Sequence, residues 1–208
     1  MALALTGFSV VAGGLLGWVN DVTAEPIAQA NAKTLSDAIA VVVPGFDNNP
    51  AEAPETVEVN GATYKIYKAT KNGQPIGAAV ESAANGFGGA LTVLVGFDNE
   101  GKIIDYSLLS HAETPGLGSK AADWFKKGAK GDITGKNPGE VPLTVSKDGG
   151  EIDAITASTI TSRAFLLAVN NAYAAYKNQH VDGASGATQQ EQPVEEAVSD
   201  TTNVEPVK

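Results

Sequence analysis

Two passages of this chain combine residue types that could bind a ligand, and the first runs from His111 to Gly118 (HAETPGLG). It follows a predicted strand, and its two glycines and its proline favour a tight loop whose backbone can approach a ligand closely. The hydroxyl of Thr114 and the N–H groups of this loop could donate hydrogen bonds to a ring edge or to a phosphate. The same residues would also suit a plain connection from a strand to a helix over Lys120–Lys127.

The second passage, Asp153–Arg163 (DAITASTITSR), opens the last predicted helix. Its Ser and Thr residues could simply be helix N-caps, which is a common role of these residue types at such a place. However, they gather where a helix N-terminus leaves N–H groups without partners, and such an N-terminus attracts anions. Arg163, one turn into the helix, could add positive charge. A phosphate suits this passage better than a cap alone requires.

The composition restricts what else the chain can do. It has 208 residues, a formal net charge of −10 and no stretch rich in Lys and Arg, which argues against nucleic-acid binding. It has no cysteine, so it can hold no iron–sulfur cluster, disulfide, thiolate zinc site or cysteine nucleophile of its own. Its two histidines, His111 and His180, are too few for a histidine-rich metal site. Any redox chemistry must therefore come from a bound organic cofactor.

The N-terminal segment predicts a transmembrane anchor over residues 1–20. Ala2–Val19 contains no charged residue, and as a helix it would span roughly 27 Å, close to the hydrocarbon thickness of a bilayer. Trp18 lies near one end of this run, where its ring suits the membrane interface. The alternative is a cleaved signal peptide with its small-residue site at Val22-Thr23-Ala24, but the basic n-region of such a peptide is missing.

Two further segments flank the predicted domain. Glu25–Val43 has the pattern of an amphipathic helix with Pro26 in its first turn, where the missing N–H costs nothing. We therefore expect a helical stalk over residues 21–45. After Asn178 the chain becomes polar and acidic without periodicity, which predicts a disordered acidic tail over residues 181–208.

Residues 46–180 predict one domain of the α+β class, with a mainly antiparallel β-sheet and flanking helices. The β pattern extends from Thr56 to about Ser146, and a last long helix over Ile160–Lys177 turns one apolar face to the sheet. Asn-Gly pairs at 60–61 and 72–73 are strong signals for tight turns between strands. The predicted strands are Val57–Val59, Thr63–Lys68, Pro75–Glu81, Leu91–Phe97 and Lys102–Leu109.

The two passages and the β-rich domain between anchor and last helix resemble the FMN-binding domain of the G subunit of Rnf complexes. The C subunit of the sodium-translocating NADH:quinone reductase has the same domain. In that family a flavin transferase reads Asp-x-x-(Ser/Thr)-Gly-Ala-Thr and links FMN, taken from FAD, through its phosphate to the final threonine. The resemblance implies Thr159 as the acceptor, with Asp153 and Thr156 matching the motif. Ala157 and Ser158 depart from its Gly-Ala pair.

The resemblance also completes the set of predicted cofactor-binding residues, with no catalytic residue and no metal ligand among them. They are His111, Glu113, Thr114, Gly116, Gly118, Asp153, Thr156, Ser158, Thr159, Thr161 and Ser162. A second stretch, Asp182–Thr188 (DGASGAT), matches the transferase motif without departure. Because no strand precedes it and no helix follows it, a flavin there would have no pocket, and Thr188 is only a secondary candidate.

The function that the resemblance implies is electron transfer. The chain would be a membrane-anchored electron carrier with covalent FMN in an Rnf-type ferredoxin–NAD oxidoreductase coupled to ion translocation. Its partners would be the other membrane subunits and, during maturation, the flavin transferase. The domain would lie on the periplasmic or outer side of the inner membrane. The alternatives are the C subunit of a sodium-translocating NADH:quinone reductase and an exported binding module without a redox role, which would lack flavin absorbance.

Overall fold

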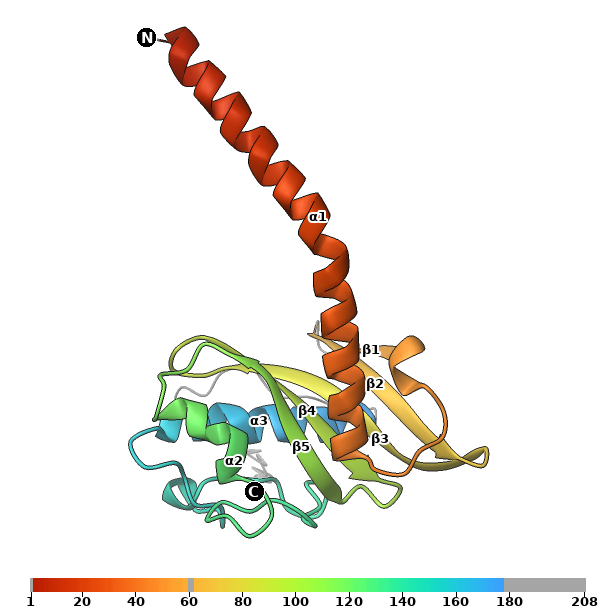
Figure 1. Cartoon of the computed structure of the whole chain (residues 1–208). Helices are drawn as coiled ribbons and strands as arrows, with labels where there is room; N and C mark the ends of the chain where they lie inside the picture. Colours follow the sequence, from red (N-terminus) through yellow and green to blue (C-terminus); the bar gives the residue numbers. More distant parts are fainter. Residues whose placement is uncertain (1, 60–61, 178–208) are drawn as a thin grey trace, which may run out of the picture.

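The computed structural model describes residues 2–59 and 62–177 and shows a β-sheet with one helix on each face. A long N-terminal helix, α1 (Ala2–Val42), projects away from the sheet, and only its last turns pack on it (Figure 1). The C-terminal helix, α3 (Thr159–Tyr176), covers the opposite face (Figure 1). The predicted α+β domain with an antiparallel sheet and flanking helices is confirmed.

The sheet is an antiparallel meander in which the strands pair in chain order, β1-β2-β3-β4-β5. The strands are β1 (Glu55–Val59), β2 (Ala62–Lys71), β3 (Gln74–Asn85), β4 (Ala90–Asp98) and β5 (Ile103–His111). Asn72 and Gly73 both have positive φ, 51° and 74°, as a tight hairpin turn of the primed type requires. The predicted hairpin of β2 and β3 is confirmed, and so is the pairing of β1 with β2. Residues 60–61 themselves lie outside the described part of the chain.

The apolar face of α3 forms the main core, as its periodicity predicted. Phe165 is fully buried and stacks on Phe125 with ring centroids 4.4 Å apart, and it makes a T-shaped contact with Tyr106 with ring centroids 4.8 Å apart. On the other face of the sheet, the end of α1 buries Ile39 and Val42. These contacts fix α3 against the sheet, and its first residues therefore have a defined position.

The N-terminal part of the chain, where an anchor and a helical stalk are expected, forms one long helix. The helix predicted over Glu25–Val43 is part of the longer α1, so Pro26 lies inside a helix instead of in a first turn. Figure 1 shows α1 bending part-way along, as expected where a proline removes a backbone hydrogen bond. Within residues 2–59 and 62–177, no helix is both long enough and apolar enough to cross a membrane. The transmembrane helix predicted over residues 1–20 is therefore not confirmed.

The β pattern also ends earlier than predicted, at His111 instead of near Ser146. The described segment from 112 to 158 contains short helical turns and one isolated bridge, between Val145 and Ile152. Glycines and prolines recur through this segment, and they interrupt strand pairing. The helix predicted over Lys120–Lys127 is shorter in the structure, α2 (Ala121–Trp124), and turns and bends follow it. The short 3-10 turns are η1 (Pro50–Glu52), η2 (Gly118–Lys120) and η3 (Ser146–Asp148).

Candidate functional site

A pocket of about 420 Å³ lies beside the first turn of α3, and three segments far apart in the sequence line it. They are the turn between β3 and β4, the loop that follows β5, and the residues that lead into α3. Six of the residues predicted to bind a cofactor lie there together: Glu113, Thr114, Gly118, Ser158, Thr159 and Thr161. The two passages that the sequence singled out thus form walls of one pocket.

The start of α3 positions Thr159 in this wall. Thr159 is the first helical residue, and the preceding residue, Ser158, makes no side-chain hydrogen bond that caps the helix. Ser162 instead holds the backbone that leads into α3. Its buried hydroxyl donates to the Ser158 carbonyl oxygen at 3.0 Å and accepts from the Ile155 N–H at 2.9 Å. The N-cap interpretation is therefore wrong for Ser158. The first turn of α3, where the helix dipole is positive, lines the pocket.

Ala157, two residues before Thr159, has a backbone conformation that glycine adopts more easily. Its φ is 62°, in the left-handed region, where a Cβ atom costs roughly 1–2 kcal/mol. In the motif that this passage resembles, glycine occupies this position. The departure from the motif therefore strains the backbone locally, and Thr159 still lines the pocket.

A lysine that the sequence did not single out supplies positive charge beside Thr159. The Nζ atom of Lys147 donates to the Thr159 hydroxyl oxygen at 3.2 Å. Arg163, which was expected to add this charge, forms a two-point ion pair with Asp148 instead, at 2.7 and 2.6 Å. Hydrogen bonding to Arg163 lowers the pKa of Asp148, and hydrogen bonding to Asp148 raises the pKa of Arg163. This pair ties the turn that carries Lys147 to α3.

Glu113 links all three walls of the pocket. Its side chain is buried, and one carboxylate oxygen, Oε1, accepts from the N–H groups of Phe87 at 2.9 Å and Gly88 at 3.3 Å. The other oxygen, Oε2, accepts from the Thr161 hydroxyl at 2.7 Å. A Cβ atom at Gly118 would lie only 2.5 Å from this second oxygen. The glycine there is therefore needed to make room for the carboxylate.

Five predicted site residues do not line the pocket. His111 is exposed and accepts the Glu113 N–H on its Nδ1 atom at 3.2 Å, while the backbone oxygen of Asp153 accepts from Trp124. The others are Gly116, Thr156 and Ser162. At Gly116 a Cβ atom would meet open space, because no atom lies within 4 Å of a Cβ built there. Its φ of 76° still favours glycine.

The pocket also has apolar residues that were not predicted from the sequence. Phe87, Leu117 and Ile160 all line it and are 71%, 41% and 37% exposed. Phe87 lies in a glycine-rich stretch between two strands (NGFGG), which is typical of an ordinary hairpin turn. A large aromatic residue between glycines is the one signal in the sequence that could have indicated a role for Phe87 in the pocket.

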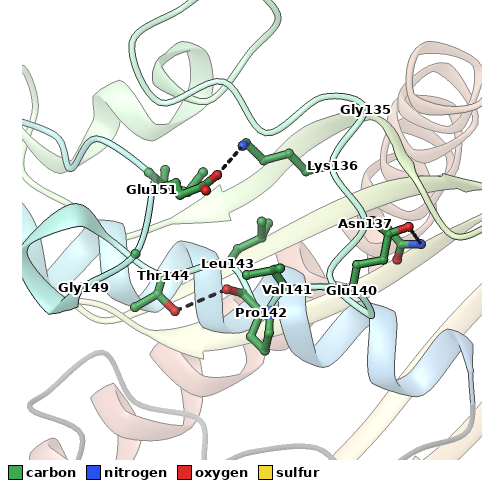
Figure 2. Close-up of a pocket in the computed structure, with 12 residues that line it drawn as sticks. Gly135, Lys136, Asn137, Glu140, Val141, Pro142, Leu143, Thr144, Gly149 and Glu151 are labelled. Atoms are coloured by element: carbon green, nitrogen blue, oxygen red, sulfur yellow. Dashed lines mark hydrogen bonds and ion pairs between the residues drawn. The ribbon is translucent and has the colours of Figure 1, made fainter.

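A second pocket, of about 330 Å³, lies among the loops between residues 135 and 152 (Figure 2). The Lys136 ammonium pairs there with Glu151 at 3.3 Å, and the Thr144 hydroxyl donates to the Pro142 carbonyl oxygen at 3.4 Å. None of the predicted site residues lines this pocket. The first pocket is therefore the candidate site.

Known proteins match the part of the chain that forms this site. Residues 86–174 match the family model described as an FMN-binding domain, and every residue of the first pocket falls in this range. The chain is 36% identical over 181 residues to the G subunit of the ion-translocating oxidoreductase complex of Yersinia pestis, covering 82% of this chain and 86% of that protein. It is 35% identical over 189 residues to the protein of the same name from Vibrio cholerae serotype O1, covering 86% and 89%.

The chain belongs to the G-subunit family of ion-translocating oxidoreductase complexes. The resemblance to the Rnf G subunits that its two motifs predicted is thereby confirmed. A crystal structure of the C subunit of the Na⁺-translocating NADH-quinone reductase from Parabacteroides distasonis is also similar, at 20% identity and a TM-score of 0.48. The match covers 71% of this chain and 91% of that chain. Membership of the G-subunit family rests on the sequence matches, which extend over most of both chains.

Proposed function

We propose that this chain carries FMN in the first pocket, bound through its phosphate to Thr159. It relays electrons as the G subunit of an ion-translocating oxidoreductase complex. The position of Thr159 supports this proposal most directly: the residue lines the pocket at the positive end of α3, with Lys147 beside its hydroxyl. When bound, FMN accepts and donates electrons. No residue of the pocket needs to act as a catalytic acid or base in that exchange.

The pocket suits FMN in size and in chemistry. Its volume of about 420 Å³ falls within the roughly 300–1,000 Å³ of ordinary ligand pockets. The phosphate would lie at the first turn of α3, where backbone N–H groups and the Lys147 ammonium favour a negative charge. The apolar side chains at the rim suit the ring system. One pocket therefore offers a polar end for the phosphate and an apolar rim for the ring.

Attachment requires a phosphoryl transfer from FAD by a flavin transferase. The Oγ1 atom of Thr159 forms a bond to the flavin-side phosphorus, and the pyrophosphate bond of FAD breaks. AMP leaves with the bridging oxygen, and the hydroxyl proton is released. Asp153 and Thr156 are exposed and line no wall of the pocket, so a transferase can read them directly. We assign these two residues to recognition by the transferase instead of contact with the flavin.

The projecting part of α1 attaches this carrier to the membrane in our proposal. Large apolar side chains are exposed along it, among them Leu15, Leu16 and Trp18 at 63%, 70% and 65%. Such a surface on a helix that points away from its domain is typical of a segment covered by lipid or by other subunits. The domain then lies on the periplasmic or outer side of the inner membrane. Its partners are the other subunits of the complex.

Membrane attachment is tested by fractionation of cells. The native protein should stay with the membranes after a high-salt wash and be released by detergent. A mature chain that begins at Glu25 and is released by salt would show that the N-terminal segment is a signal peptide.

Replacing the acceptor hydroxyl tests the flavin proposal. Thr159→Val keeps the size of the side chain and removes the oxygen that would bind phosphorus. On a denaturing gel the wild-type band should fluoresce under ultraviolet light, and the Thr159→Val band should not. The matched control is Thr188→Val, whose position lies outside the described residues and which should stay fluorescent. If the two variants behave the other way round, Thr188 carries the flavin. A wild-type protein without flavin, purified from cells that contain the transferase, would support the binding module.

A further inference from the structure

The exposed apolar side chains of the domain gather at one place. Four large ones are exposed among residues 43–59 and 62–177: Phe87, Leu117, Val141 and Ile160. Three of them line the first pocket, and only Val141 lies elsewhere, in the second pocket. Apolar surface that clusters at the rim of a pocket, with charged and polar surface around it, is typical of a site that a ligand covers.

Phe87 is the most exposed member of this cluster, although its backbone is firmly held. Its ring is 71% exposed, while its N–H donates to the buried Glu113 carboxylate at 2.9 Å. The glycines on both sides are needed there. A Cβ atom at Gly86 would collide with the Glu113 carboxylate, and one at Gly88 would collide with the carbonyl oxygen of Ala112. The turn thus presents an aromatic ring from a defined position instead of from a loose loop.

The same carboxylate ties this ring to the start of α3. Glu113 accepts from Phe87 and Gly88 through Oε1, and from the Thr161 hydroxyl through Oε2 at 2.7 Å. Thr161 lies two residues after Thr159, so the attachment point and the aromatic ring are held to one buried group. A ligand bound through Thr159 would therefore meet Phe87 at a fixed place across the pocket.

We propose that Phe87 packs against the flavin ring and closes one face of it to solvent, with Glu113 as the residue that positions it. This inference rests on the proposed attachment of FMN to Thr159. The chemistry favours it because the flavin ring is flat and aromatic, and aromatic rings prefer offset stacking or edge contacts with one another. Leu117 and Ile160 supply the other large apolar side chains that line the pocket around the ring.

The test measures how easily iodide quenches the fluorescence of the bound flavin. Full-length protein carrying flavin is compared with Phe87→Ala, Phe87→Tyr and the control Val141→Ala, whose side chain is 65% exposed outside this pocket. We expect the quenching constant to rise about twofold in Phe87→Ala, because one face of the ring loses its cover. Phe87→Tyr and Val141→Ala should keep the wild-type value. The midpoint potential of the flavin should shift in Phe87→Ala and not in Val141→Ala.

The outcomes distinguish a failure of this inference from a failure of the proposed FMN attachment. Denaturing gels first report the flavin content of every variant, independently of Phe87. A wild-type chain without covalent flavin overturns both this inference and the proposed function. A fully loaded Phe87→Ala protein with unchanged quenching and unchanged potential overturns this inference alone. If that same variant also fails to assemble with the other subunits, the ring is a contact for a partner protein instead.

Discussion

Removing the Glu113 carboxylate should destabilise the domain more than any exposed substitution, because this buried group accepts three hydrogen bonds. The donors are the N–H groups of Phe87 and Gly88 and the hydroxyl of Thr161, at 2.9, 3.3 and 2.7 Å. A hydrogen bond to a charged group contributes about 1.5–3 kcal/mol where water is excluded. Water in the pocket can reach the freed donors of a Glu113→Ala variant and reduces this loss. We therefore expect about 2–4 kcal/mol of destabilisation in total.

Glu113→Gln separates the shape of the side chain from its charge. Its amide oxygen can accept the two N–H groups, and the Thr161 hydroxyl can rotate to accept from the amide nitrogen. The expected loss is therefore only about 1 kcal/mol, from the weaker neutral hydrogen bonds. Glu58→Ala, on an exposed position of β1, is the control and should change stability by less than about 0.5 kcal/mol.

Urea unfolding of the full-length chain, followed by circular dichroism, measures these differences. With a slope of roughly 2 kcal/mol per M, the midpoint of Glu113→Ala should fall by about 1–2 M. The midpoint of Glu113→Gln should fall by about 0.5 M. A Glu113→Ala midpoint equal to that of Glu58→Ala would refute the view that this carboxylate holds the three walls together. Equal losses in the Ala and Gln variants would mean that charge, and not shape, decides.

Three further predictions concern the residues around α3. Ala157→Gly should raise the free energy of unfolding by about 0.5–1 kcal/mol in thermal melts. It removes the strain of the positive φ of 62°, and the greater conformational entropy that glycine gives the unfolded chain offsets part of this gain. Lys147→Ala should slow flavin attachment by the purified transferase by up to about fivefold, the effect of an exposed charge, whereas Lys136→Ala should not. Arg163 lowers the pKa of Asp148 in the folded state. The Asp148 carboxylate therefore stabilises the fold at any pH above its unfolded pKa of about 3.9, and this stabilisation is lost as the pH falls through the lower folded-state pKa. Asp148→Asn should therefore be less stable than wild type at neutral pH and equally stable in strong acid, as urea titrations at both pH values would show.

The elements that could be predicted from the sequence alone are those whose signals are local. The Asn72-Gly73 pair specified a hairpin because two consecutive residues with positive φ suit only a few residue types. The 3.6-residue period of the last helix predicted α3 to within about one residue at each end. The motif residues likewise indicated the G-subunit family, because each motif is a short contiguous stretch of sequence. All of these signals lie within a few residues of the structure that they specify.

The construction of the pocket could not be predicted from the sequence, because residues far apart in the chain form it. Glu113 meets Phe87 across 26 residues of chain and Thr161 across 48, and Lys147 reaches Thr159 across 12. Neither local propensity nor periodicity indicates such pairs, because they depend on how separate elements pack against one sheet. The same reason explains the error at Arg163, whose charge was expected to be free and is paired with Asp148 in the fold. Residue types show which groups are able to bind a phosphate or a ring. Packing at a distance decides which of them face the same space.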